Sequence, residues 1–190
     1  MPPAAALDSA RALVGWQKLS LDSARRAVRL ATAGMRLDLG GIAKGYILQA
    51  AVETLRERGV ARTLIEAGGD IVAGDPPAGR RRRGWRVEAA GADPAVAQRA
   101  ARLARAAIAT SGPTEQFVEI GGTRYSHVVD PRTGVGLTNG LVATVIAPDG
   151  ATADALATAL TVLDAGRRAE VLARFPGVQA SVRPAPRPRR

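Results

Sequence analysis

Residues 37–46, Leu-Asp-Leu-Gly-Gly-Ile-Ala-Lys-Gly-Tyr, constrain the fold most, because two glycines separate an apolar segment from an amphipathic one. Leu37 and Leu39 alternate around Asp38, which predicts the end of a buried strand. Gly40 and Gly41 permit backbone angles and close approaches that a Cβ would block. The following residues predict a helix from Ile42 to Arg58 with one buried face. That face is expected to carry Ile47, Ala50, Ala51 and Leu55.

A strand, a glycine turn and a helix start would direct several unpaired backbone N–H groups at one point, which suits an anion such as a phosphate. Lys44 stands in the first helical turn, where a cation opposes the helix dipole unless an anion is bound. Only two of the 27 basic residues are lysines, so a compact point charge is indicated here. A solvated lysine beside an ordinary turn explains the same residues equally well. The spacing is not that of a P-loop.

The net charge of +10 is concentrated in two places. Arg80 to Arg83 form one cluster, and Arg183, Arg187, Arg189 and Arg190 form another. Without these eight charges the formal charge would be +2. Neither cluster carries interleaved aromatic residues that could stack on bases, so no specific nucleic-acid partner is expected.

The chain of 190 residues is long enough for one core, and it contains no cysteine. Disulfides, thiolate metal sites and a cysteine nucleophile are therefore excluded. We find no apolar run of transmembrane length, no signal peptide in Met1 to Gly15 and no lipid-attachment cysteine. The compartment stays open, because cysteine-free chains occur on both sides of a membrane.

Turn residues divide the rest of the chain into short strands and helices. The fold class expected is α+β: a mixed, largely antiparallel sheet with helices packed on it. One domain is expected over residues 1–182, and a basic disordered tail over 183–190. Predicted strands include 62–67, 71–74, 85–89, 107–110, 116–120, 123–129, 141–147 and 178–182, and predicted helices include 6–14, 93–105, 152–163 and 167–175.

Asp154 and Thr158 lie one turn apart on the predicted helix, on the same side. A carboxylate and a hydroxyl among alanines supply hard oxygen ligands, which suit Mg²⁺. An acidic residue near a helix start, favoured by the dipole, explains Asp154 alone and is the simpler interpretation.

His127, the only histidine, precedes the sharp turn Asp130-Pro131-Arg132-Thr133-Gly134. It could act as a base, contact a phosphate or be a hydrogen-bonded surface residue. The turns at Gly68-Gly69-Asp70 and Thr110-Ser111-Gly112 are weaker signals, because such turns are common.

Taken in order, the stretches 38–46, 68–70, 109–112, 127–134 and 153–159 strongly resemble the FAD:protein FMN transferases of the ApbE family. The resemblance implies a Mg²⁺-dependent transfer of FMN from FAD onto a threonine of a partner flavoprotein, with release of AMP. Alternatives are an FAD pyrophosphatase of the same family and a non-catalytic flavin-binding module.

The resemblance also implies a set of site residues. The catalytic residues would be His127 and Lys44. FAD would contact Asp38, Lys44, Gly69, Asp70, Ser111, His127 and Val128. Mg²⁺ would bind the main-chain oxygens of Gly41 and Ala157 and the side chains of Asp154 and Thr158.

Family members normally carry a longer segment before the Asp-Leu-Gly-Gly stretch, whereas 37 residues precede Asp38 here. We therefore expect a fold shortened at its N-terminal side, and a homodimer or a partner supplying the other half. An exposed sheet edge would favour such pairing. Members of the family are often periplasmic or membrane-anchored, but no such address is found in this sequence.

Overall fold

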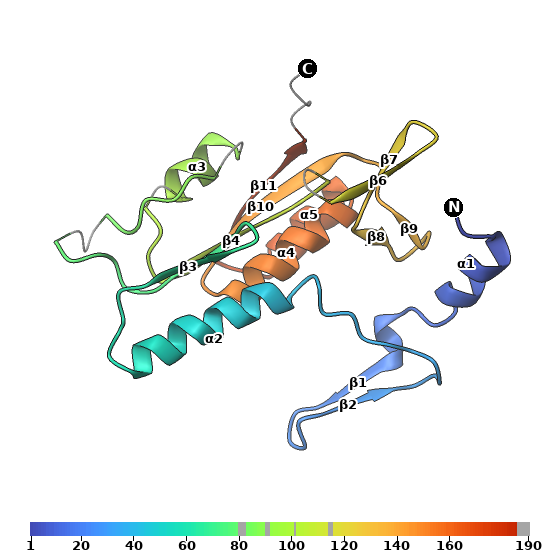
Figure 1. Cartoon of the computed structure of the whole chain (residues 1–190), viewed down its shortest axis with the longest axis horizontal. Helices are drawn as coiled ribbons and strands as arrows, with labels where there is room; N and C mark the ends of the chain where they lie inside the picture. Colours follow the sequence, from blue (N-terminus) through green and yellow to red (C-terminus); the bar gives the residue numbers. More distant parts are fainter. Residues whose placement is uncertain (80–82, 90–91, 101, 114–115, 186–190) are drawn as a thin grey trace.

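A five-stranded antiparallel sheet forms the centre of the molecule, in the computed structural model that describes residues 1–79, 83–89, 92–100, 102–113 and 116–185 (Figure 1). The strand order is β11-β10-β5-β4-β3. The strands are β3 (Leu64–Ala67), β4 (Asp70–Ala73), β5 (Ala106–Ser111), β10 (Leu141–Ala147) and β11 (Gln179–Pro184). Every neighbouring pair in this sheet is antiparallel, and helices pack on it. The predicted α+β class is confirmed.

Both faces of the sheet are covered, because its central strands alternate apolar side chains between them. Ala107 and Ala109 of β5 face the helices α2 (Ala43–Glu57) and α4 (Gly150–Val162), with α5 (Ala165–Leu172) beside them. Ile108 and Ile146 face the opposite side, where α3 (Pro94–Ala100) packs. The sheet is therefore the middle of three layers.

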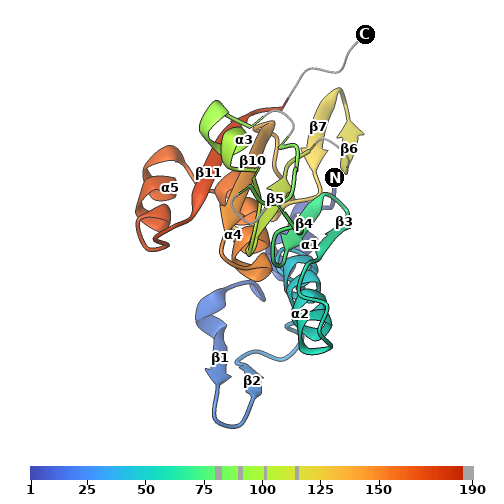
Figure 2. The same ribbon diagram turned by 90° about the vertical axis from the view of Figure 1, so that its left-hand side faces the viewer.

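Smaller elements lie around this core. They are α1 (Ala4–Arg11), the 3₁₀ turn η1 (Trp16–Lys18), β1 (Leu19–Asp22), β2 (Ala27–Leu30), β6 (Phe117–Ile120), β7 (Thr123–Ser126), β8 (Val129–Asp130) and β9 (Val135–Gly136). The β1–β2 hairpin stands away from the central sheet in both views (Figures 1 and 2). No residue of α1, β1 or β2 is buried.

The prediction of a buried strand end at residues 37–39 is wrong. Residues 35–39 form no strand, and Leu37 and Leu39 are exposed. Instead, Asp38 Oδ1 accepts a hydrogen bond from Gly40 N at 2.8 Å, which turns the chain locally. The predicted face of α2 is also partly wrong, because Ile47 is 62% exposed while Leu48 and Val52 are buried.

Other boundaries also differ from the predictions, and three of the differences follow from the packing. Residues 85–89 make only one bridge, Trp85 to Leu103, because Val87 and Ala89 pack onto the sheet face instead of pairing at an edge. The helix from Pro94 ends at Ala100 rather than near residue 105, since Leu103 returns to that bridge. The predicted strand 123–129 divides, and Val129 pairs with Gly136 in β8–β9.

The predicted tail begins too early. Arg183 and Pro184 belong to β11 and pair with Val142 and Leu141. Residues 186–190, and residues 80–82 of the arginine-rich loop, lie outside the described residues. Within the described residues, no helix has the length and apolar character needed to cross a membrane.

Candidate functional site

A cleft of about 660 Å³ collects most of the residues singled out from the sequence. Its walls come from the start of α2, the β3–β4 turn, the end of β5, the segment before β8, and α4. The lining residues are Asp38, Gly40, Gly41, Lys44, Gly68, Gly69, Thr110, Ser111, Gly112, Gln116, His127, Val128, Val129, Asp154 and Thr158. Segments more than a hundred residues apart in the sequence therefore meet at one place.

The close crossing of α2 and α4 produces this meeting. A Cβ on Gly45 would lie 2.0 Å from the Gly150 carbonyl oxygen, and a Cβ on Gly150 would lie 2.2 Å from the Gly45 oxygen. The backbones touch, so neither position can hold a side chain. This contact brings Lys44 at the start of α2 beside Asp154 of α4.

The side chain of Asp154, which belongs to α4, contacts the first turn of α2. Its Oδ2 accepts a hydrogen bond from Gly45 N at 3.0 Å, and the carboxylate is buried. Ile42 N and Ala43 N both donate to Leu39 O. The expectation of unpaired N–H groups is therefore wrong for these three amides, which already have partners. The anion that complements the helix dipole here is a protein carboxylate.

Lys44 is held over the β3–β4 turn. Its Nζ donates to the Gly68 carbonyl oxygen at 3.0 Å and lies 3.1 Å from Asp70 Oδ2. Gly68 and Gly69 have φ of +55° and +86°, a conformation that favours glycine. The turn that the two glycines allow thus presents a carbonyl to the ammonium group.

Asp70, at the start of β4, is 2% exposed. Burial raises the pKa of its carboxyl above the ordinary value, and the charge of Asp154 adds to this, whereas Lys44 opposes it. Lys44 and the Thr110 backbone come near the carboxylate. No described group, however, completes a hydrogen bond of good geometry to either oxygen. Asp70 is not among the lining residues of the cleft.

The oxygen atoms of Gly41, Asp154 and Thr158 are of the kind that a hard cation such as Mg²⁺ prefers. A Cβ on Gly41 would lie 3.5 Å from Thr158 Oγ1, so the two residues are in contact. Asp154 and Thr158 line the cleft with Gly41, whereas Ala157 is buried and does not line it. No group of three or more His, Cys, Asp or Glu side chains suited to a metal occurs in the described part of the chain. Mg²⁺ tolerates this, because it commonly takes one or two carboxylates, waters and substrate phosphates.

His127 reaches the cleft from the segment between β7 and β8, and its side chain is exposed. Its Nδ1 lies 3.1 Å from the Gln116 carbonyl oxygen. A carbonyl only accepts hydrogen bonds, so Nδ1 is the donor in this contact, and in a neutral ring Nε2 would be the acceptor.

Gln116 and Val129 are cleft residues that the sequence reasoning missed. A usable signal existed for Gln116. The two-residue Gly121-Gly122 turn sets the β6–β7 register, in which Phe117 pairs with Ser126. Extending that register by one residue places Gln116 opposite His127, where the His127 N–H also donates to the Gln116 oxygen at 3.3 Å.

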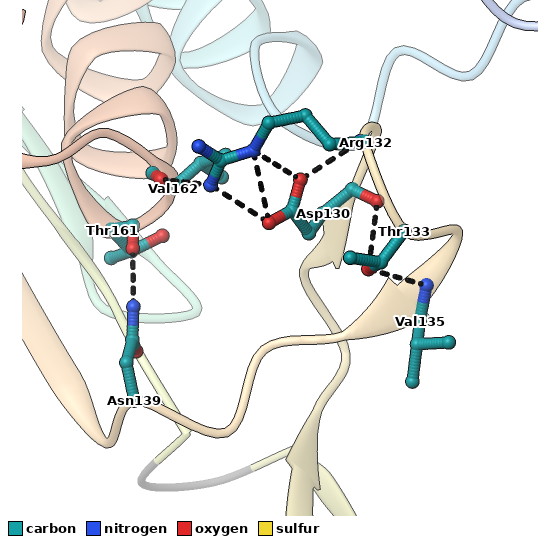
Figure 3. A network of polar contacts seen from close by, with 7 residues as sticks. All are labelled: Asp130, Arg132, Thr133, Val135, Asn139, Thr161 and Val162. Carbon is teal, nitrogen blue, oxygen red and sulfur yellow. Dashed lines mark hydrogen bonds and ion pairs between the residues drawn. The ribbon is translucent and has the colours of Figure 1, made fainter.

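The segment after His127 is tied to the far end of α4 (Figure 3). Arg132 Nη2 donates to the Val162 carbonyl oxygen at 3.2 Å and to Asp130 Oδ2 at 2.8 Å. Asn139 Nδ2 donates to the Thr161 oxygen at 2.8 Å. Carbonyl groups in the last helical turn lack partners inside the helix, so these bonds fix the loop to α4. The loop that follows His127 is thereby anchored to α4, the helix that carries Asp154.

A second, largely apolar cavity of about 590 Å³ adjoins the cleft and shares Gln116, His127 and Val129 with it. Its apolar wall comes mainly from the β6–β7 hairpin and β8–β9. That wall includes Phe117, Val118, Ile120, Tyr125 and Val135. A ligand in the polar cleft could extend an apolar ring into this space.

Comparison with known proteins gives a consistent result. The model of the ApbE family matches residues 1–182. An FAD:protein FMN transferase of Treponema pallidum (strain Nichols) is 37% identical over 83% of this chain and 46% of its own length. One of Klebsiella pneumoniae (strain 342) is 34% identical over 84% of this chain and 49% of its own. The chain thus spans about half the length of the curated relatives it matches.

Solved structures agree. The apo form of the flavinyl transferase ApbE of Pseudomonas stutzeri superimposes with a TM-score of 0.74 at 34% identity, covering 95% of this chain and 55% of that one. The ApbE protein of Thermotoga maritima gives 0.75 at 30% identity, covering 95% and 58%.

Proposed function

This chain belongs to the ApbE family, and from that premise we propose that it transfers FMN from FAD onto a threonine hydroxyl of a partner flavoprotein, releasing AMP, with Mg²⁺ as cofactor. The observation that carries the proposal is the single cleft shared by Lys44, His127, Asp154 and Thr158. Family resemblance supplies the substrates, and the geometry supports the roles of the residues.

The transfer replaces one phosphorus–oxygen bond with another. The threonine oxygen bonds to the phosphorus of the FMN half, and the bond from that phosphorus to the bridging oxygen breaks, with its electrons leaving on AMP. Such a reaction needs charge neutralisation and an aligned nucleophile more than covalent help. The Lys44 ammonium would bind a phosphate oxygen, and His127 Nε2 would accept the hydroxyl proton.

The oxygens of Gly41, Asp154 and Thr158 would hold Mg²⁺, with the Ala157 carbonyl as the further ligand that the family resemblance implies. When bound, the ion would neutralise charge on phosphate oxygens. Asp38, Gly69, Ser111 and Val128 would complete the contacts to FAD. The adjoining apolar cavity supports a substrate that joins an aromatic ring to its phosphates, as FAD does.

Hydrolysis of FAD to FMN and AMP is a second candidate. The exposure of His127 favours it, because water can reach the imidazole that would otherwise activate threonine. The two reactions differ only in the nucleophile.

The test is incubation of the chain with FAD, Mg²⁺ and an acceptor flavoprotein bearing the target threonine. We expect AMP release together with covalent flavin on the acceptor, measured by chromatography and mass spectrometry. AMP and free FMN would indicate the hydrolase instead. Flavin bound without any AMP would contradict both reactions and leave a flavin-binding module.

Asp154→Asn is the matched variant, because an amide oxygen can still accept the Gly45 hydrogen bond while the charge is lost. We expect turnover to fall about 100-fold or more at limiting Mg²⁺. Turnover equal to that of the unaltered chain would remove Asp154 from the metal site.

A further inference from the structure

Asp70 is a buried carboxylate next to the cleft but outside it. Its side chain is 3% exposed, and neither oxygen has a hydrogen bond of good geometry from the described residues. The only cation paired with it among those residues is Lys44, whose Nζ lies 3.1 Å from Oδ2. The carboxylate therefore depends on Lys44 for compensation of its charge.

A buried carboxylate paired with a lysine contributes little to the free energy of folding, because apolar residues of similar volume would often stabilise the fold as well or better. Its presence here therefore suggests a role other than stability. Removing one partner leaves an uncompensated charge. The side chain of Lys44 is 37% exposed, so the ammonium group sits between the buried carboxylate and the open cleft.

The Lys44 ammonium group keeps a hydrogen-bond donor for a ligand in the cleft. An ammonium group carries three N–H donors. One donates to the Gly68 oxygen, and the ammonium nitrogen lies within ion-pair distance of Asp70 Oδ2, 3.1 Å away. Because the three donors diverge from one nitrogen, at least one more is available to a ligand in the cleft that Lys44 lines.

We propose that Asp70 is a positioning residue that fixes the Lys44 ammonium for an anionic phosphate group of the substrate, without touching the substrate itself. The inference rests on the proposed function, which supplies the diphosphate. It differs from the expectation that Asp70 binds FAD directly. The Gly68-Gly69-Asp70 turn would then serve the lysine, through one carbonyl and one carboxylate.

The positioning role predicts the direction in which anion affinity changes when Asp70 loses its charge. Removal of a negative charge near an anion site should strengthen anion binding by simple electrostatics. A positioning role predicts instead that anion binding weakens when Asp70 is neutralised in the chain that retains Lys44. Without Lys44, Asp70 has nothing to position and only repels the phosphate.

The experiment is a double-mutant cycle with Asp70→Asn and Lys44→Met, measuring the affinity for FAD and for inorganic pyrophosphate by calorimetry. We expect Asp70→Asn to weaken FAD binding about tenfold when Lys44 is present, a coupling of ordinary size. In the Lys44→Met background the same substitution should leave binding unchanged or strengthen it. The thermal midpoint of Lys44→Met should rise when Asp70→Asn is added, because the buried charge disappears.

Asp75→Asn is the matched control, since Asp75 pairs with Arg56 and Arg105 and does not line the cleft. We expect it to leave both affinities unchanged. Weakening by Asp70→Asn in both backgrounds would indicate direct contact with FAD and overturn the positioning role. Strengthening in both would reduce Asp70 to a repulsive charge. If the unaltered chain bound neither FAD nor pyrophosphate, the proposed function would itself be overturned.

Discussion

At the scale of single residues, Asp154 both stabilises a helix start and lines the candidate site. Its Oδ2 caps the start of α2 through Gly45 N, and the same carboxylate lines the cleft with Thr158. A carboxylate at a helix N-terminus is stabilised by the helix dipole, which compensates for its burial. The sequence predicted that Asp154 and Thr158 lie on the same side of one helix, but only the fold reveals the contact of Asp154 with Gly45.

A second carboxylate, Asp130, makes a testable contribution to stability. The guanidinium of Arg132 lowers the pKa of Asp130 through hydrogen bonds, and burial only partly opposes this. A lowered folded pKa stabilises the fold above the unfolded carboxyl value, about 3.9. That stabilisation is lost as the pH falls through the folded value.

We therefore expect Arg132→Met to lower the thermal midpoint at pH 7, and the deficit to shrink as the pH is reduced toward 2. A smaller deficit should persist, because Arg132 also donates to the Val162 oxygen. Arg167→Met, which removes an exposed ion pair with Glu170, should change little at any pH. A deficit that does not vary with pH would contradict the role of Asp130.

At the scale of elements, α2 and α4 stabilise each other's first turns. Asp154 of α4 accepts from Gly45 N of α2, and Gln49 Oε1 of α2 accepts from Gly150 N of α4 at 3.2 Å. The helices approach this closely only because both residues at the crossing are glycines. The geometry of the site thus depends on a helix packing contact.

Gly45→Ala tests this dependence. Its Cβ would lie 2.0 Å from the Gly150 oxygen, so the helices must separate. We expect a loss of about 3 kcal/mol in the free energy of unfolding, at the upper end for overpacking, and weaker FAD binding.

The control is Gly166→Ala in α5, where the new Cβ would be 3.6 Å from Asp164 Oδ1, an ordinary contact. Alanine should raise stability there by about 0.5–1 kcal/mol, because it is the better helix former. Denaturant unfolding measures both variants. Equal effects of the two substitutions would show that the crossing is not tight.

At the scale of the whole molecule, buried residues are concentrated in the sheet and the helices packed on it. The elements before residue 36 contribute no buried residue, and they expose apolar side chains such as Trp16 and Leu21. Segments with few buried contacts open at low free energy.

Hydrogen exchange should therefore divide the chain into two classes. We expect backbone amides of residues 4–30 to exchange by local opening at low free energy, and those of β5 and β10 to require an opening close to global unfolding. Mass spectrometry of peptides after deuterium labelling measures this. Comparable protection of β1–β2 and β10 would contradict the prediction.

Local patterns predicted much of this protein. Hairpin turns at Gly68-Gly69 and Gly121-Gly122, and the buried strand 141–147, were placed correctly, because turn chemistry and a continuous apolar run of strand length are encoded locally. Most of the candidate site residues also follow from short motifs. Errors arose at Leu37, Ile47 and Arg183, where pairing or burial is decided by distant partners.

By itself the sequence determined the α+β class and the family resemblance, and it predicted which residues are candidates for binding phosphate and metal. The tertiary structure alone decided that Asp154 caps α2, that Asp70 is buried against Lys44, and that Gln116 orients His127. The reason is physical. Turns and periodicity depend on neighbours along the chain, whereas capping, ion pairing and burial depend on backbones brought together by the packing of α2 and α4 on the sheet.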